Sequence, residues 1–466
     1  MRSLRSSWPL ALVCAVLLAA TPRRARADPA PDPDALLKAV NDPMLGPPPS
    51  PVKVLGSWIE GVHIVRSNSP NIRTALARVE QAEGLSRKAL GALLPSLSIT
   101  GTATQHMLLG LGTAFLASGV EQGTTIPQPP LGATVNLGLA LPIIAPRAWF
   151  DRATASRVVE SVHAAGANID RITLATLADA IVTVVMAERL TEISRLSLRS
   201  ALAVLDISNR SAQLGGHTMK LDVLRAEQEV SIARTQLLQT NEGLLRAREA
   251  LGTVLGDASG WGVAPGLKVD GLFSEKEMAC HVLGDVRARA DLQSAKLDVE
   301  VAERNVRSPL YAFTPKIHAV STLGYVSNAL ASPNGRHLSW TVGALLTWEL
   351  FDGVRLGERA ANKGTYHAAQ ESLRETTRRG QLEVTQSRRA VEAASSNLEV
   401  SRSSRGAAAE AAHLSRVAFA GGLITSLELT DATRRWRESE LSFAVKEFEL
   451  IRARLTALFV MLGCDP

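Results

Sequence analysis

The hydrophobic pattern of the chain changes its period several times, and each change predicts a new element. In SLSITGTATQ (96–105), Leu97 and Ile99 alternate with serine and threonine, which is the period-2 pattern of a β-strand with one apolar face. The same alternation returns at 134–141 and 338–350, and in weaker form at 316–326. We therefore expect four strands of about ten residues, each with an apolar face and a face of small or polar residues.

Between the strands, apolar residues recur every three or four positions, as a helix requires. Leu174, Leu177, Ile181 and Val184 belong to a pattern that runs from about 149 to 214, and further helices are expected at 219–255, 353–420 and 423–462. More than about 60 residues at about 1.5 Å each give roughly 90–100 Å, which is longer than a globular domain needs. Shorter helices, at 70–94 and 283–308, precede the first strand of each half, the first of them with Ser69 as its N-cap.

The two halves of the chain resemble each other. A glycine pair interrupts the helical pattern at Gly215 and Gly216 and again, 206 residues later, at Gly421 and Gly422. LRAR at 245–248 returns as IRAR at 451–454, and Pro95 returns as Pro315. Two copies of a helix–strand–strand–long helix–helix unit follow from this order. The expected division is a signal peptide at 1–27, a Pro-rich tail at 28–60, repeat 1 at 61–257, an equatorial linker at 258–276 and repeat 2 at 277–466.

The first residues predict export. Arg2 and Arg5 precede a short apolar stretch, and Ala25-Arg26-Ala27 is a cleavage site, which together make a secretory signal peptide. Without residues 1–27 the chain has 46 basic and 45 acidic residues, so its charge gives no reason to expect a nucleic-acid partner. Two cysteines remain, Cys280 and Cys464; they can pair in an exported protein or stay as isolated thiols.

The strands have the length and alternation of transmembrane β-strands, and no later segment predicts a membrane-spanning helix. Four such strands cannot close a barrel, because open sheet edges in lipid leave backbone groups unpaired. The chain must therefore associate with copies of itself. The fold class expected is an α+β membrane protein, in which a long antiparallel α-helical coiled-coil barrel joins a transmembrane β-barrel.

No catalytic constellation is present in the sequence. The nine histidines are scattered, the serines lack a G-x-S-x-G context, and no Gly-rich phosphate loop follows a strand. Cysteine and histidine spacings suggest no metal site. We expect no enzyme activity, no cofactor and no metal.

At this point the sequence resembles the TolC-type outer-membrane efflux proteins. The most specific segments are WELFDG at 348–353, GGHTMKLDVLRAE at 215–227, GGLITSLELTDA at 421–432 and LGTVLGD at 251–257, and the resemblance covers nearly the whole chain after residue 27. It implies a homotrimer with a twelve-stranded barrel in outer-membrane lipid and a helical tunnel in the periplasm. The glycine pairs would then turn the chain at the periplasmic tip of that tunnel.

The resemblance also implies a function. The trimer would be a passive, porin-like exit duct of a tripartite efflux or type I secretion system, working with a periplasmic adaptor (membrane fusion) protein and an inner-membrane pump of the RND, ABC or MFS type. Substrate and pump class stay open. The alternative is a trimeric coiled-coil envelope spacer or adhesin without transport, which explains the helices and export but not the paired strands.

Two groups of site residues are expected. Glu428 and Asp431 share one helix face and match the family's acidic ring at the tunnel entrance, where repulsion between copies would raise their pKa values. The alternative is a pair of helix N-terminal acids favoured by the helix dipole. The aromatic residues Trp149, Phe150, Trp340 and Trp348 are expected at the membrane interface, or else packed between subunits.

The sequence departs from the family in one place. An arginine and a tyrosine that often latch the tip of these proteins are matched here by Ile424 and Phe419. We therefore expect any closed state to depend on apolar contacts and other pairs. The conformation of the Gly-rich loop 106–130 stays open.

Overall fold

The computed structural model describes residues 42–105, 114–115, 121–122, 131–213, 217–265, 267, 280–282, 285–327, 336–420 and 423–464. The predicted signal peptide, most of the 106–130 loop and the four tip glycines lie outside the described residues. The chain divides into two compact units. One contains residues 1–46 and 196–234 and the other contains 47–195 and 235–466, and each is described by itself below.

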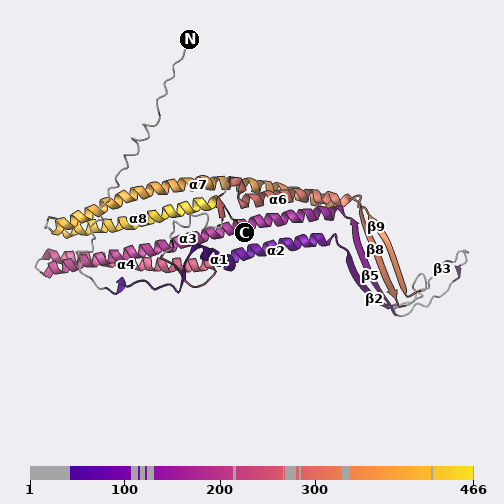
Figure 1. The fold of residues 1–466 in the computed structure, drawn as a ribbon, viewed down its shortest axis with the longest axis horizontal. Coiled ribbons are helices and arrows are strands. Elements are labelled where there is room, and N and C mark those ends of the chain that lie inside the picture. Colours follow the sequence, from indigo (N-terminus) through magenta and orange to yellow (C-terminus); the bar gives the residue numbers. More distant parts are fainter. Residues whose placement is uncertain are drawn as a thin grey trace, which may run out of the picture. The chain divides into compact units, whose positions relative to one another are not determined.

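Helices account for most of the larger unit and follow the predicted order (Figure 1). Two short helices, α1 (Trp58–Asn68) and α2 (Pro70–Gly91), precede the first strand. The long helices α3 (Pro146–Gln213) and α7 (Gly353–Ala420) each have 68 residues, which gives each about 100 Å of rise. The other helices are α4 (His217–Leu255), α6 (Ala290–Arg307) and α8 (Ser426–Val460), with 3-10 turns at Pro43–Leu45, Val286–Ala288 and Ser308–Phe313.

The four predicted strands form one antiparallel sheet in the order β2-β5-β8-β9. They are β2 (Ser96–Gln105), β5 (Leu131–Ile144), β8 (Lys316–Val326) and β9 (Leu338–Thr347). A small hairpin, β3 (Ala114–Phe115) with β4 (Glu121–Gln122), falls within the loop 106–130. Helix α2 leads into β2 and α6 leads into β8, while β5 leads into α3 and β9 leads into α7. All four connections therefore lie at the same end of the strands (Figure 1).

Two details at the ends of elements differ from the sequence expectation. We expected Pro142 to end its strand, but β5 continues to Ile144 across an irregularity between Pro142 and Ile144. A bulge accommodates the missing N–H of proline without ending the ladder. Ser69 stands before α2 as predicted, with Pro70 in the first turn, but its side chain makes no capping hydrogen bond.

The core of the larger unit lies where α1, α3, α4 and α8 come together. Leu174, Leu177 and Ile181 of α3 are fully buried among Leu251 and Leu255 of α4 and apolar residues of α1 and α8. Within the span expected to be a tail, β1 (Lys53–Leu55) pairs in parallel with β6 (Trp261–Val263), and Leu55 and Trp58 enter this core. Full burial of a leucine contributes about 1.5–3 kcal/mol, so this segment is part of the fold.

A third small sheet joins the end of the chain to its middle. There β10 (Leu462–Cys464) pairs antiparallel with β7 (Cys280–Val282). In the smaller unit, the C-terminal part of α3 and the N-terminal part of α4 contain buried apolar residues, among them Leu198, Leu202, Ala226 and Val230. Arg234 of α4 pairs there with Asp42 at 2.7 Å and lowers the pKa of that carboxyl.

Candidate functional site

The four-stranded sheet has one continuous apolar face. The pairing register places Ile99 beside Leu137, Leu137 beside Leu323, and Leu323 beside Trp340, so the apolar positions of all four strands form rows. The side chains on this face are strongly exposed in the single chain; Ile99 is 73% exposed and Val342 71%. An apolar face of this extent requires a cover, and lipid or a partner can supply it.

The opposite face is small and polar. A row there contains Thr100, Asn136, Gly324 and Ser339. A Cβ on Gly324 would lie 2.8 Å from Oδ1 of Asn136 and 3.1 Å from Oγ of Ser339, so a larger residue there would require these side chains to move. Thr102 and Thr134 share a hydrogen bond between their hydroxyls at 2.6 Å on the same face. A sheet with one lipid-type and one water-type face is typical of the wall of a membrane barrel.

The dimensions of the sheet also fit a membrane. Strands β2 and β9 have 10 residues each and β8 has 11. Ten residues at about 3.4 Å, tilted by about 40°, give a height of roughly 26 Å, close to the ~25 Å apolar band of outer-membrane barrels.

The four predicted interface aromatics do not share one environment. Trp149, Trp340 and Trp348 are 50%, 73% and 59% exposed. Trp340 donates from Nε1 to Ser321 Oγ at 2.9 Å, and Trp348 donates to the carbonyl of Phe313 at 3.0 Å. Phe150 differs, because it stacks on Tyr311 with ring centroids 4.5 Å apart and has the Arg304 guanidinium 4.6 Å from its ring centre. Phe150 therefore has packing partners within its own chain, and its placement at the membrane interface stays a prediction.

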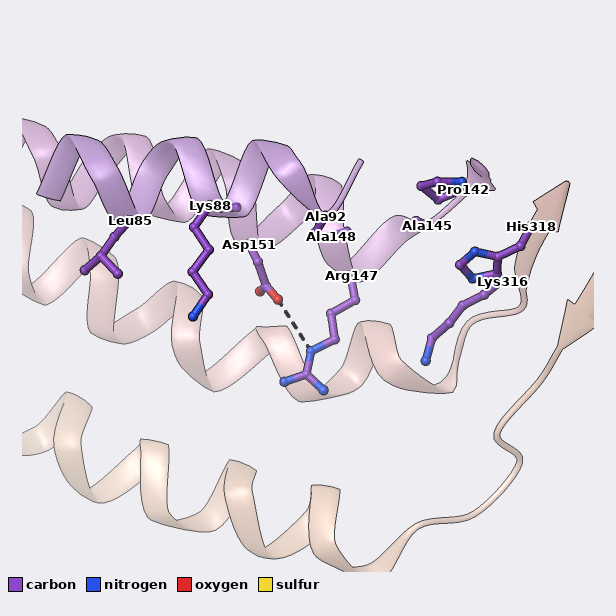
Figure 2. A pocket seen from close by; sticks show the side chains of 11 residues that line it. Leu85, Lys88, Ala92, Pro142, Ala145, Arg147, Ala148, Asp151, Lys316 and His318 are labelled. Atoms are coloured by element: carbon purple, nitrogen blue, oxygen red, sulfur yellow. Dashed lines mark ion pairs between the residues drawn. The ribbon is translucent and has the colours of Figure 1, made fainter. Parts of the chain in front are cut away.

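A cavity lies where the strands meet the helices (Figure 2). It measures about 450 Å³ and is lined from α2, α3, β5 and β8 by Lys88, Arg147, Asp151, Lys316, His318 and apolar neighbours. Arg147 pairs with Asp151 at 3.5 Å, drawn in Figure 2, and with Glu358 at 2.9 Å. Lys316 pairs with Glu349 at 3.0 Å. The first of these interhelical contacts, Arg147 with Glu358, joins α3 to the start of α7, and Lys316 with Glu349 joins β8 to the segment between β9 and α7. The cavity therefore lies where the sheet connects to the helices.

The predicted acidic pair lies at the start of α8, and each carboxylate has local partners. Glu428 completes a capping box with Thr425: its carboxylate accepts from Thr425 N at 2.8 Å, and Thr425 Oγ1 accepts from Glu428 N at 3.3 Å. Asp431 pairs with Arg434 at 2.6 Å and Arg435 at 2.8 Å. The hydrogen bond from Arg434, with the charge of Arg435, lowers the pKa of Asp431.

The raised pKa values expected for this pair depend on repulsion between copies of the chain. Within one chain, the hydrogen bond from Arg434 lowers the pKa of Asp431. Sequence reasoning passed over Arg434 and Arg435, although they lie three and four residues after Asp431 and so share its helix face. In the smaller unit, Asp222 and Arg225, which occupy the matching positions, form an ion pair at 3.6 Å.

Near this end of α8, other pairs join it to α7. Arg405 binds Glu440 at 2.6 Å and lies 4.8 Å from the ring centre of Phe443. Arg416 lies 5.8 Å from the ring centre of Trp436. Phe419 and Ile424, at the positions of the family's latch, are half-buried, and Leu423 between them is 82% exposed.

Across the described residues, no group of three or more His, Cys, Asp or Glu side chains is placed to hold a metal ion. Within the parts of the chain that the structure describes, none of the helices is both long and apolar enough to cross a membrane.

Comparisons with known proteins give a consistent result. Residues 286–463 match the family model of the outer membrane efflux protein. No curated protein matches the chain. Among solved structures, the chain is similar to the outer membrane protein VceC of Vibrio cholerae, with 16% identity and a TM-score of 0.70 over 88% of this chain and 97% of that one.

Two further channels show the same fold. The CmeC outer membrane channel of Campylobacter jejuni has 13% identity and a TM-score of 0.71 over 87% of this chain and 85% of that one. The MtrE outer membrane channel of Neisseria gonorrhoeae has 17% identity and a TM-score of 0.70 over 88% of this chain and 89% of that one. The match to the outer membrane efflux protein family covers residues 286–463, and the fold of these outer membrane proteins extends over most of the chain.

Proposed function

We propose that three copies of this chain form a passive exit duct through the outer membrane. The single observation that carries the proposal is the two-faced sheet, whose apolar side is left exposed by the parts of the chain that the structure describes. Its edge strands are β2 and β9. Open edges in lipid are costly, and pairing β9 of one copy with β2 of the next removes them in a closed ring.

Twelve strands also suit a channel. A barrel of about eight strands is filled by its own side chains, whereas one of about sixteen leaves a water channel. The inward face here carries small residues such as Ser98, Thr100, Gly138, Thr322 and Gly343. Small side chains favour an open lumen in a barrel of intermediate size.

The helices would continue this duct into the periplasm as a coiled-coil barrel. The matching lengths of α3 and α7 support the two proposed repeats, 61–257 and 277–466, joined by the linker 258–276. A periplasmic adaptor and an inner-membrane pump would supply the cargo and the energy. The cargo would be small molecules or proteins, and selection would lie with the pump.

At the periplasmic end we propose that Glu428 and Asp431 line the entrance. Glu428 would mainly hold the first turn of α8, since it completes the capping box. Asp431 would balance Arg434 and Arg435. Replacing Asp431 by asparagine would remove one negative charge beside these two cations, while Arg434 keeps its pair with Glu438 at 3.1 Å. Ion selectivity should therefore move toward anions. An unchanged selectivity would place the entrance filter elsewhere.

We propose that the tryptophans mark the two membrane interfaces. Trp340 lies near the loop end of β9, and Trp348 follows its helix end, eight residues on. Eight residues at about 3.4 Å and about 40° of tilt separate them by roughly 21 Å in height. That is near the spacing of two aromatic girdles, and Trp149 would join the periplasmic one. Lipid-borne quenchers that left all tryptophan fluorescence unchanged would contradict this placement.

The proposal is tested by the size and activity of the purified protein. Detergent-solubilised protein from the outer-membrane fraction should have the mass of three chains, migrate faster before heating than after, and release small solutes from liposomes. A trimer that releases no solute would favour the spacer or adhesin alternative. Protein recovered from the soluble periplasm would contradict the duct.

A further inference from the structure

The two cysteines outside the predicted signal peptide lie opposite each other in a sheet. The register of β10 on β7 pairs Leu462 with Val282, Gly463 with His281, and Cys464 with Cys280. These positions are 184 residues apart in the sequence (464 minus 280), so local chain geometry does not bring them together. Directly opposite residues of an antiparallel pair have Cα atoms about 4.5 or 5.5 Å apart. Both values fall within the range of about 4.4–6.8 Å that disulfides span.

The β10 side of this pairing is held by its surroundings. Leu462 is 1% exposed and belongs to the main core, with Phe459 one turn earlier. Arg171 of α3 donates to the carbonyl of Phe459 at 2.8 Å, which fixes the end of α8. A slip by one residue would turn Leu462 out of the core.

The chain that follows β7 is also held. Asp285 accepts a hydrogen bond from Arg287 N at 3.0 Å and so caps the short 3-10 turn. Arg289 is 2% exposed and pairs with Asp291 at 2.8 Å and Glu383 at 2.9 Å. Both strands of the small sheet therefore lie close in sequence to fixed points, and their register places Cys280 opposite Cys464.

We propose that Cys280 and Cys464 form an intramolecular disulfide in the mature protein. The inference rests on the outer-membrane location, because its periplasmic part then folds in an oxidising compartment. The oxidant would be a protein disulfide donor of that compartment. One cysteine thiolate attacks the donor disulfide to give a mixed disulfide, and the second thiolate then displaces the donor. Two S–H bonds are exchanged for one S–S bond in this chain, and the donor leaves as a dithiol.

The bond would tie the end of the chain to the start of its second half. It would close a covalent loop that contains α6, β8, β9, α7 and α8, and it would fix the C-terminal end of α8 beside the segment before α6. Any movement at the Thr425 end of α8 would then be a bend along the helix, because its other end could not slide.

The test uses full-length protein made with its own signal peptide. Cells are quenched in acid, the outer-membrane fraction is alkylated with N-ethylmaleimide under denaturing conditions, and the intact mass is measured. We expect a mature chain two hydrogen atoms lighter than the sum of its residues, without an adduct, and a peptide that joins Cys280 to Cys464. After reduction, two adducts should appear.

Single variants provide the controls. Cys280→Ser and Cys464→Ser should each gain one adduct without reduction. Two adducts on unreduced wild-type protein from the outer membrane would overturn the proposal, and so would a covalent dimer that reduction separates. Fractionation of the same sample distinguishes failure of the location from failure of the pairing.

Discussion

One pair of neighbouring substitutions can distinguish the role of the apolar face of the sheet from that of the polar face. Leu137 and Asn136 are adjacent in β5 and lie on opposite faces, Leu137 beside Ile99 and Leu323, and Asn136 beside Thr100 and Gly324. We predict that Leu137→Arg prevents assembly in the outer membrane, whereas Asn136→Arg is tolerated. The first change puts a cation toward lipid, and the second puts it toward the lumen.

The magnitude follows from the position of Leu137. It lies six residues from Leu131 and seven from Ile144, the two ends of β5. At about 3.4 Å per residue and about 40° of tilt, Leu137 is roughly 16–18 Å in height from either end, close to the middle of the membrane. Arginine at that depth costs about 2–4 kcal/mol, or roughly 30- to 900-fold in the folding equilibrium of each chain.

The assay is the yield of heat-modifiable trimer in the outer-membrane fraction, followed by the urea midpoint of whatever trimer is recovered. Leu137→Ala is the control for lost side-chain volume, and its trimer should be recovered. Asn136→Arg should form a trimer with altered ion selectivity. Equal tolerance of both arginines would refute the assignment of the apolar face to lipid, and loss of Asn136→Arg alone would reverse the two faces.

Three further predictions concern the periplasmic part. Arg289→Met should lower the free energy of unfolding, measured by chemical denaturation, by about 2–3 kcal/mol, because the partly exposed carboxylates of Asp291 and Glu383 then lose their buried partner. As a control, Arg379→Met removes a member of an exposed ion pair and should change this free energy by less than about 0.5 kcal/mol. Lys53, Ser259 and Trp261 hydrogen-bond Asp257 and hold its pKa well below the usual range. The stabilising contribution of the Asp257 carboxylate is present above about pH 4 and is lost as the pH falls through its folded pKa. The difference in thermal midpoint between wild type and Asp257→Asn should therefore shrink from pH 7 to pH 3. A difference that stays constant over this range would contradict the prediction. Thr425→Ala removes the capping box and should destabilise the first turn of α8 by about 1 kcal/mol. This loss would be measured as faster amide hydrogen exchange in that turn. Unchanged exchange would show that other contacts hold the turn.

Long periodic elements were predictable from the sequence. The bounds of β2, β8 and the four long helices agree with the hydrophobic pattern to within a few residues. The pattern is strong because the strands alternate over about ten residues and the helices repeat over many turns.

Short and long-range features were not predictable. The strand β1 has three residues and pairs with β6 about 200 positions later in the sequence, so no local hydrophobic pattern predicts it. The ion pair of Arg66 with Asp170, at 2.6 Å, joins residues 104 positions apart. Proline normally ends a ladder, and only the bulge beside Pro142 shows why β5 continues.

The candidate site was partly predictable. The sequence indicated that Glu428 and Asp431 share a helix face, but the capping role of Glu428 depends on the φ and ψ of Thr425, which is extended. The partners of Asp431 carried a usable signal, since Arg434 and Arg435 follow at helical spacing. Exposed aromatic residues are not distinguished by sequence from packed ones, and Phe150 is of the packed kind.

The central claim, that a trimer of this chain is an open-ended duct, is tested most directly by single-channel conductance in planar bilayers. Wild-type trimer is measured beside the Glu428→Ala/Asp431→Ala variant after both are shown to be folded. We predict stable unitary steps for both, with a different ion selectivity in the variant. The absence of steps from folded trimer of either protein would contradict the account.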